Sequence, residues 1–329
     1  MIDLSKLFQE FASLKVGIIG DVMLDTYIWG QVERISPEAP VPVVSLDKKE
    51  YRIGGAGNVA LNCQALGATV SLLSVCGPDE EGVVLKDLLK QNKVNTTYLH
   101  NSSKRLTTNK TRIISRNQQM MRLDAEHTED LNETETNAFL RKIEKYITTQ
   151  KPDILIFEDY NKGVLTKKII EKTIGLCKKY KVLTAVDPKR KNFFAFKQAD
   201  IFKPNLKEVK EGLHLMTEEV SLPILKKIHQ QLKKELQHDI SFITLSAKGV
   251  FYQQGNTADI YASYMRNIAD VSGAGDTVIA VGAMVYAITK NVRLMAEIAN
   301  IAGGLVCEEV GTVAIHREKL LEECKLLLV

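Results

Sequence analysis

Six short apolar runs recur along most of the 329-residue chain, and segments with helical periodicity lie between them. The runs are residues 16–19, 69–74, 154–157, 182–186, 201–202 and 240–245. The helical segments include residues 166–180, which start at a residue suited to an N-cap, Thr166, and residues 222–236. Strands that alternate with helices predict a parallel sheet covered by helices on both faces. We therefore expect a single domain, residues 1–329, with a doubly wound, mostly parallel α/β fold.

Two stretches, residues 27–51 and 110–123, interrupt this alternation. The first contains three prolines and the second is apolar or alternating around a polar turn at 116–118, so neither has the period of a helix. Each predicts a strand pair outside the main sheet, and the two would form a small β lid over the strand ends where open α/β sheets bind ligands. The alternative is that both are surface hairpins. An edge of the lid would be a candidate surface for a homodimer.

Composition excludes several classes of protein. Hydrophobic residues make up 45% and charged residues 26% of the chain, as in globular proteins and unlike disordered or fibrous ones. The net charge of +4 is spread without a basic block, so no nucleic-acid or membrane partner is predicted. Five cysteines without a CxxC pair argue against a disulfide framework or a zinc site. Residues 1–14 have the spacing of an amphipathic helix, not of a signal peptide, and no stretch approaches a membrane span, so we expect a cytoplasmic protein.

The strongest local signal is the run DVSGAGDT at 270–277, which leads into an Ala- and Val-rich helical segment at 278–288. Its small residues, Gly273, Ala274 and Gly275, predict a helix N-terminus whose free N–H groups hold an anion such as a transferring phosphoryl group. Asp276 in the first turn would face the same spot and accept the proton of an attacking hydroxyl. The alternative is that Asp276 merely complements the helix dipole.

A second glycine-rich run, GGAGN at 54–58, also enters a helical segment. It is neither a Walker loop nor a dinucleotide fingerprint. Gly54 and Gly55 would let a polyol approach the backbone, while Asn58 offers both a donor and an acceptor to its hydroxyls. A tight turn before a helix is the alternative.

Two further groups follow predicted strands. Asn205 could cap a helix with Glu208 at its third position, close to a capping box. In the functional alternative, both lie at the carboxyl end of a strand and reach the hydrated magnesium and the phosphates of a nucleotide. Asp187 and Lys189 end another strand in the same way and suit magnesium and phosphate respectively, although solvation at the surface explains them equally well.

Taken together, these segments resemble the ribokinase-like, or PfkB, carbohydrate kinases from about residue 16 to residue 312. The run at 54–58 is similar to the first family signature, the run at 270–276 to the second, and Asn205 to Glu208 to the NxxE element between them. The resemblance implies an ATP-dependent sugar kinase with Asp276 as catalytic base and residues 273–275 as the anion hole. It also implies that Asn205 and Glu208 together bind magnesium and phosphate, and that Glu208 contacts the magnesium through water.

The resemblance implies further contacts with the cofactors. Ser246, Lys248 and Gly249 are similar to a loop beside the adenine nucleotide, although Ser246 stands where many members have glycine. Asn300 is similar to a position that flanks the adenine. Asp270 and Ser272 resemble the positions that hold a monovalent cation in potassium-activated members, so K⁺ joins ATP and Mg²⁺ among the expected cofactors.

Four segments, at 20–25, 34–44, 115–119 and 159–163, are similar to the family members that phosphorylate D-glycero-β-D-manno-heptose 7-phosphate at its C1 hydroxyl for the lipopolysaccharide core. That likeness implies that Asp25 and Asp159 contact the sugar. Lys162, after a predicted strand, and Arg112, in the expected lid, are candidates for its phosphate. Bifunctional relatives add a nucleotidyltransferase domain, which these 329 residues lack, so we expect a kinase alone. The alternatives are a kinase for another phosphosugar, such as fructose 6-phosphate, and a non-catalytic sugar-binding regulator.

Overall fold

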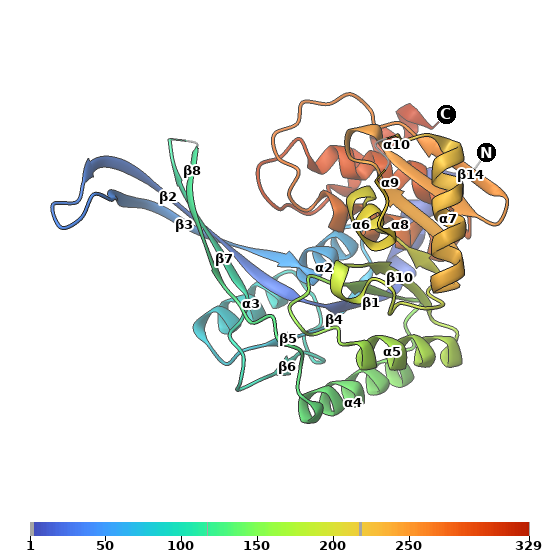
Figure 1. Ribbon diagram of the computed structural model, residues 1–329, viewed down its shortest axis with the longest axis horizontal. Coiled ribbons are helices and arrows are strands. Elements are labelled where there is room, and N and C mark those ends of the chain that lie inside the picture. The colour runs from blue at the N-terminus through green and yellow to red at the C-terminus, as the bar shows by residue number, and fades with distance from the viewer. Residues whose placement is uncertain (1–2, 117, 217–218, 329) are drawn as a thin grey trace.

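The main sheet has eight strands, in the order β14-β13-β12-β11-β10-β9-β1-β4. It lies in the body of the molecule, where Figure 1 labels β14, β10, β1 and β4. The computed structural model describes residues 3–116, 118–216 and 219–328, so Asn117 of the second expected lid stretch lies outside the described residues. The strands are β1 (Lys15–Gly20), β4 (Thr69–Leu73), β9 (Ile154–Glu158), β10 (Leu183–Asp187), β11 (Ile201–Phe202), β12 (Ile240–Thr244), β13 (Val250–Gln254) and β14 (Thr257–Tyr261). The first six are mutually parallel, whereas β13 and β14 extend the edge as antiparallel strands, which the sequence pattern did not predict.

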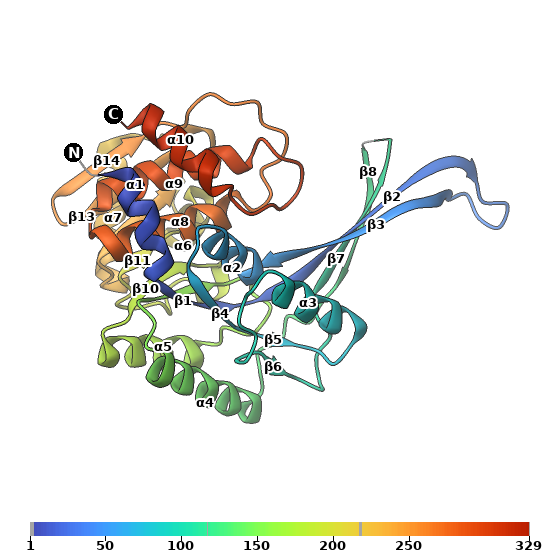
Figure 2. The same ribbon diagram turned by 180° about the vertical axis from the view of Figure 1, so that it is seen from behind.

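Alternate residues of each central strand enter two separate hydrophobic cores. On β9, Ile154 and Ile156 belong to one core, while Leu155 and Phe157 belong to the other. The first core is supplied by α1 (Leu4–Glu10), α2 (Ala56–Ala65), α3 (Glu80–Gln91), α8 (Ala274–Thr289), α9 (Val292–Val306) and α10 (Arg317–Leu327). The second core is supplied by α4 (Glu133–Gln150), α5 (Lys167–Tyr180), α6 (Leu206–Leu213) and α7 (Leu222–Leu236). Figure 2 shows α4 and α5 on the side of the sheet opposite α1, α8 and α9. The predicted doubly wound α/β fold is therefore confirmed.

The helices begin and end close to the predicted signals, and Thr166 caps α5 by accepting a hydrogen bond from the Ile169 N–H. Short 3₁₀ helices cover Phe11–Ser13, Arg190–Asn192 and Ser246–Lys248. Among the described residues, no helix combines the length and the apolar character needed to cross a membrane. All five cysteines are buried and unpaired.

The two expected lid stretches form one four-stranded sheet that projects from the body of the molecule (Figure 1). Its strands, in the order β3-β2-β7-β8, are β2 (Val22–Ile35), β3 (Pro42–Gly55), β7 (Asn109–Ser115) and β8 (Gln118–Ala125). β2 pairs antiparallel with β3 and parallel with β7. A two-stranded sheet of β5 (Val75–Cys76) and β6 (His100–Asn101) lies apart from the lid sheet. The β lid is confirmed, and its first hairpin is longer than the expected range of 27–51.

The β2–β3 hairpin of the lid is joined to the body almost without linkers. Asp21 alone separates β1 from β2, and β3 runs directly into α2. Gly55, at this second junction, has a φ of 58°, and a Cβ there would lie 2.4 Å from the Asp21 carbonyl oxygen, so the junction requires glycine. The buried Asp21 carboxylate accepts hydrogen bonds from the backbone N–H groups of Tyr160, Lys162 and Val164. This contact ties the base of the lid to the segment after β9.

Candidate active site

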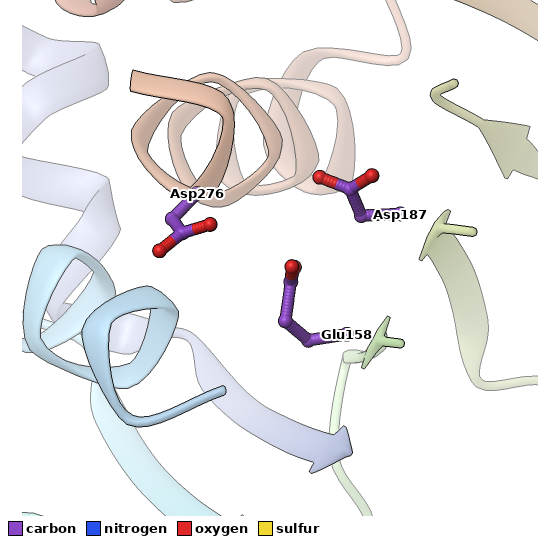
Figure 3. A group of neighbouring side chains, drawn as sticks. All are labelled: Glu158, Asp187 and Asp276. Atoms are coloured by element: carbon purple, nitrogen blue, oxygen red, sulfur yellow. The ribbon is translucent and has the colours of Figure 1, made fainter. Parts of the chain in front are cut away.

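Three buried carboxylates meet where β9, β10 and α8 converge. Glu158 ends β9, Asp187 ends β10 and Asp276 lies in the first turn of α8. One carboxylate oxygen of each lies within 4.8 Å of the others, and the side chains point toward one another (Figure 3). The carboxyl ends of parallel strands share one edge of a sheet, which is where ligands bind in open α/β folds. This group is therefore the centre of the candidate site.

Asp276 has the environment expected of a general base. Its Oδ2 accepts a 2.8 Å hydrogen bond from the Asn58 amide, and its Oδ1 accepts one of 2.8 Å from the Tyr160 hydroxyl. Burial raises the pKa of Asp276 to about 6, although the hydrogen bonds from Asn58 and Tyr160 oppose the shift. The carboxylate is thus mostly ionised at neutral pH, and its pKa lies close to that pH, which suits proton abstraction from a hydroxyl.

Glu158 and Asp187 leave buried oxygen atoms without partners. Both carboxylate oxygens of Glu158 and Oδ1 of Asp187 lack a hydrogen-bond partner among the described residues. Burial, reinforced by the charges of Asp187 and Asp276, raises the pKa of Glu158 well above its usual range. Unpartnered buried polar atoms are uncommon and call for an explanation. A set of oxygen ligands of this kind fits a hard divalent cation such as Mg²⁺.

The N-terminus of α8 faces a buried ammonium. The Lys203 Nζ lies 2.7 Å from Oδ2 of Asp187, and its side chain is 2% exposed. A Cβ at Gly275 would lie 3.8 Å from both of these atoms, so the first turn of α8 borders the ion pair. Gly273 is the N-cap, with a φ of 79°. Free N–H groups at a helix N-terminus, the dipole of α8 and a buried lysine are the features that suit the binding of an anion.

Asn205 and Glu208 form the capping box of α6. The Asn205 Oδ1 accepts a hydrogen bond of 2.8 Å from the Glu208 N–H, and Oε2 of Glu208 accepts one of 2.8 Å from the Asn205 N–H. Oε1 of Glu208 accepts a hydrogen bond of 2.6 Å from the Lys189 ammonium, which lies 4.0 Å from Oδ1 of Asp187. The capping box, which was one of the two expectations for these residues, is therefore present. Glu208 is also linked to Asp187 through the Lys189 ammonium.

The lid brings a second set of predicted residues together. Asp25 on β2 is buried and forms a 2.5 Å ion pair with Arg112 on β7. A Cβ at Gly54 would lie 2.3 Å from the Asp25 carboxylate, so glycine keeps this face of the lid open. Lys110 lies two residues before Arg112 on β7, and its ammonium is 5.4 Å from the ring centroid of Tyr160. The lid thus contacts Tyr160, the residue whose hydroxyl donates a hydrogen bond to Asp276.

The two remaining residues predicted to contact the sugar already have protein partners. The Lys162 ammonium lies 2.6 Å from Glu126. The Asp159 carboxylate accepts hydrogen bonds from the Asn161 N–H and the Asn192 amide. Burial, together with the nearby charge of Asp21, raises the pKa of Asp159 to about 7. A ligand would have to compete for Lys162 with one carboxylate.

The positions expected beside the nucleotide lie on the 3₁₀ turn after β12 and on α9. Ser246 begins the 3₁₀ turn that includes Lys248, and its φ of 56° explains why glycine would suit that position. Gly249 follows with a φ of 91°. Asn300 on α9 donates 2.8 Å to the Ala262 carbonyl. This contact connects α9 to the segment after β14.

Sequence reasoning missed three residues of the candidate site: Glu158, Tyr160 and Lys203. Glu158 and Lys203 each follow a predicted strand by one residue, as Asp187 does, so the rule that ligands gather at strand ends would have found them. Tyr160 carries no such signal. Its hydroxyl meets Asp276 only because the chain turns back after β9.

Comparison with known proteins adds a family to this geometry. Residues 13–319 match the family described as pfkB family carbohydrate kinase. The bifunctional protein HldE of Sulfurimonas denitrificans is 35% identical over 96% of this chain, and that of Aliarcobacter butzleri is 38% identical over 93%. The chain spans 65% and 63% of the length of these two relatives.

Solved structures share the fold at low identity. Phosphofructokinase-2 from Escherichia coli in complex with potassium has a TM-score of 0.77 and 17% identity, covering 95% of this chain and 99% of its own. Arabidopsis thaliana ribokinase complexed with ribose and ATP has a TM-score of 0.70 and 17% identity, covering 94% of this chain and 99% of its own. The fold is therefore ribokinase-like.

Removal of the Tyr160 hydroxyl should raise the pKa of Asp276. In Tyr160→Phe we expect a rise of about one unit, because a hydrogen bond to a charged group is worth about 1.5 kcal/mol and one pKa unit is about 1.4 kcal/mol. A ¹³C NMR titration of the carboxyl carbons measures the shift, and the signal of Asp276 is the one missing in Asp276→Asn. The exposed Tyr180→Phe is the control. An unchanged pKa in Tyr160→Phe would show that the hydroxyl does not stabilise the ionised carboxylate.

Proposed function

The chain belongs to the pfkB family of carbohydrate kinases and is an ATP-dependent sugar kinase, and we propose that it phosphorylates D-glycero-β-D-manno-heptose 7-phosphate at the C1 hydroxyl. The observation that carries the chemistry is the placement of Asp276, a buried carboxylate with a pKa of about 6, in the first turn of a helix whose N-terminus faces Lys203. A base and an anion site lie within one turn.

The proposed reaction uses these residues in two roles. Asp276 accepts the proton of the sugar hydroxyl as that oxygen forms its bond to the γ-phosphorus of ATP and the bond to ADP breaks. The N–H groups around residues 273–275 and the Lys203 ammonium stabilise the negative charge of the transferring group. Tyr160 and Asn58 orient the carboxylate through the two hydrogen bonds that it accepts. Positioning and charge stabilisation would supply most of the rate.

ATP acts in this family with a divalent metal, which we propose to be Mg²⁺. The unpartnered oxygens of Glu158 and Asp187 fit direct or water-mediated contact with it. Glu208 fits a contact through water, because both of its oxygens already accept hydrogen bonds from the protein. The metal would neutralise charge on the phosphates. We also propose that K⁺ is held by Asp270 and Ser272, as their resemblance to potassium-activated kinases implies.

Removal of the charge on Glu208 should raise the magnesium requirement. In Glu208→Gln we expect the Mg²⁺ concentration at half-maximal rate to rise several-fold, because a hydrated cation loses one negative charge nearby. Glutamine still completes a capping box, so α6 should stay folded. Glu211→Gln, on the same helix, is the control. An unchanged magnesium titration in Glu208→Gln would assign Glu208 to the capping box alone.

The choice of sugar rests on the relatives and the lid. The relatives named bifunctional protein HldE align along nearly the whole chain, and four segments resemble heptose 7-phosphate kinases. The lid side of the site offers three cations for a sugar phosphate: Lys110, Arg112 and Lys162. Fructose 6-phosphate is the nearest alternative acceptor. The complete Asp276 site argues against a non-catalytic regulator.

A panel of acceptors tests the proposed function. With ATP and Mg²⁺, we expect heptose 7-phosphate to give the highest kcat/KM, above fructose 6-phosphate and unphosphorylated heptose. Asp276→Asn should lower kcat by roughly two to four orders of magnitude, the usual contribution of a general base. Since a protonated base cannot accept a proton, kcat/KM should fall as the pH drops below about 6, the pKa of Asp276. A preference for fructose 6-phosphate would reject the heptose assignment but leave the kinase.

Lys162→Met extends the same panel to the sugar phosphate. A charge-assisted contact is worth about 1.5–3 kcal/mol, so its loss should raise KM for the phosphorylated heptose roughly tenfold or more and leave KM for ATP unchanged. Lys168→Met, at a more exposed position, is the control. Equal effects on phosphorylated and unphosphorylated heptose would exclude Lys162 as the phosphate anchor.

We also propose that a second copy of the chain covers the lid. β8 is the edge strand of the lid sheet, and all of its residues that the structure describes are exposed. Exposed apolar side chains gather on the lid strands: Ile35, Leu46, Met120, Met121 and Leu123. Exposed edges and apolar patches of this kind favour association. We expect a dimer mass in sedimentation equilibrium and a monomer for Leu123→Glu, with Val83→Glu on α3 as the control; a monomeric wild-type chain would reject the interface.

A further inference from the structure

Arg52 carries a contact from the lid to the body that the proposed reaction does not yet use. It lies near the end of β3, directly opposite Asp25 on β2. Its Nη1 donates 2.7 Å to the Val310 carbonyl and 3.5 Å to the Thr312 carbonyl, more than 250 residues further along the chain. Its Nε donates 2.7 Å to Glu50. One guanidinium thus holds two carbonyls of the loop after α9.

The loop is shaped to fit against this guanidinium. Gly311, between the two carbonyls, has a φ of 75°, which favours glycine. A Cβ there would lie 2.5 Å from the Arg52 Nη1 and 2.9 Å from the Tyr27 hydroxyl. A side chain at position 311 would therefore strain the backbone there and displace either the loop or the Arg52 guanidinium. The close approach of loop and lid depends on both residues.

The same loop contacts the start of α8. The Gly311 N–H donates 2.9 Å to Oδ2 of Asp270, and Oδ1 of Asp270 accepts from the N–H and the hydroxyl of Ser272. A Cβ at Gly273, the N-cap of α8, would lie 3.1 Å from the Thr312 methyl. Residues 310–312 therefore pack against the segment that presents the proposed anion hole.

On the lid, Arg52 is connected to the proposed sugar contact. The guanidinium carbon of Arg52 lies 4.9 Å from the ring centroid of Tyr27, and that of Arg112 lies 5.2 Å from it. Arg112 in turn pairs with Asp25. Contacts therefore run from Asp25 through Arg112, Tyr27 and Arg52 to the loop, and from the loop to α8.

We infer that Arg52 is a positioning residue that fixes loop 310–312 against the N-terminus of α8, so that the anion hole depends on the lid. This inference rests on the proposed function for its effect on catalysis but not for the contact itself. Arg52 reaches no reacting atom. Its loss should leave the pocket for ATP intact and misplace the residues that surround the transferring group.

Arg52→Met tests the inference by two measurements. We expect kcat for the best acceptor of the panel to fall roughly 10- to 100-fold with KM for ATP nearly unchanged, since a displacement of about 1 Å in an active site can cost a hundredfold. Hydrogen exchange, read by mass spectrometry on peptides that cover residues 308–316, should become faster in the substrate-free variant. Guanidinium ion should partly restore the rate of Arg52→Ala, because it can occupy the space next to the two carbonyls.

The control is Lys48→Met. Lys48 lies on the same strand, contacts Glu50 as Arg52 does and carries the same charge, but stacks on Trp29. It should match the wild type in kcat and in exchange of residues 308–316. If Arg52→Met proves unstable, Arg52→Lys, which keeps the charge, should show an intermediate kcat and exchange rate. Unchanged exchange and kcat in Arg52→Met, or equal losses in Lys48→Met, would overturn the inference. A wild type that phosphorylates no sugar would instead reject the proposed function, while the exchange result would still judge the contact.

Discussion

The buried ion pair between Lys203 and Asp187 is the interaction on which the rest of the site depends. Glu158, Asp187 and Asp276 are buried close together, and the ammonium of Lys203, itself 2% exposed, contacts Asp187 directly. Breaking a buried pair by removing one partner typically costs about 3–5 kcal/mol, because the other charge stays buried alone. The ends of β10 and β11 and the first turn of α8 therefore have to come together as one unit.

Sequence periodicity was sufficient for the layers of the fold, because alternating strands and helices have few ways to bury their apolar faces. The lid followed from two stretches without helical period, and Asp276 from the small residues before it. Glu158 and Lys203 each directly follow a predicted strand, but a single polar residue there was not weighted as a site residue, because only the strand order brings the ends of β9, β10 and β11 side by side. Antiparallel β13 and β14 were missed because their apolar runs are short and mixed with polar residues.

Glu208 takes part in two kinds of contact within the protein. One oxygen closes the capping box of α6, and the other accepts from Lys189 beside Asp187. A carboxylate that is already held in place suits a contact through water with a bound cation, because no further side-chain entropy is lost when the ligand binds. The bond that orders the helix thus also orients the charge. The same logic applies to Asn58, which sits in α2 and donates to Asp276.

The almost linker-free junctions of the lid have a mechanical consequence. Because Asp21 alone stands between β1 and β2, and β3 continues straight into α2, the β2–β3 hairpin of the lid has no loop that could serve as a hinge at its base. Both strands of the hairpin are fixed to the body at one end and free at the other. Movement at its free end would have to come from bending and twisting of two 14-residue strands, with the strain spread along their length. The stiffness of that pair of strands, rather than a loop rearrangement, would then set how fast a sugar enters and leaves.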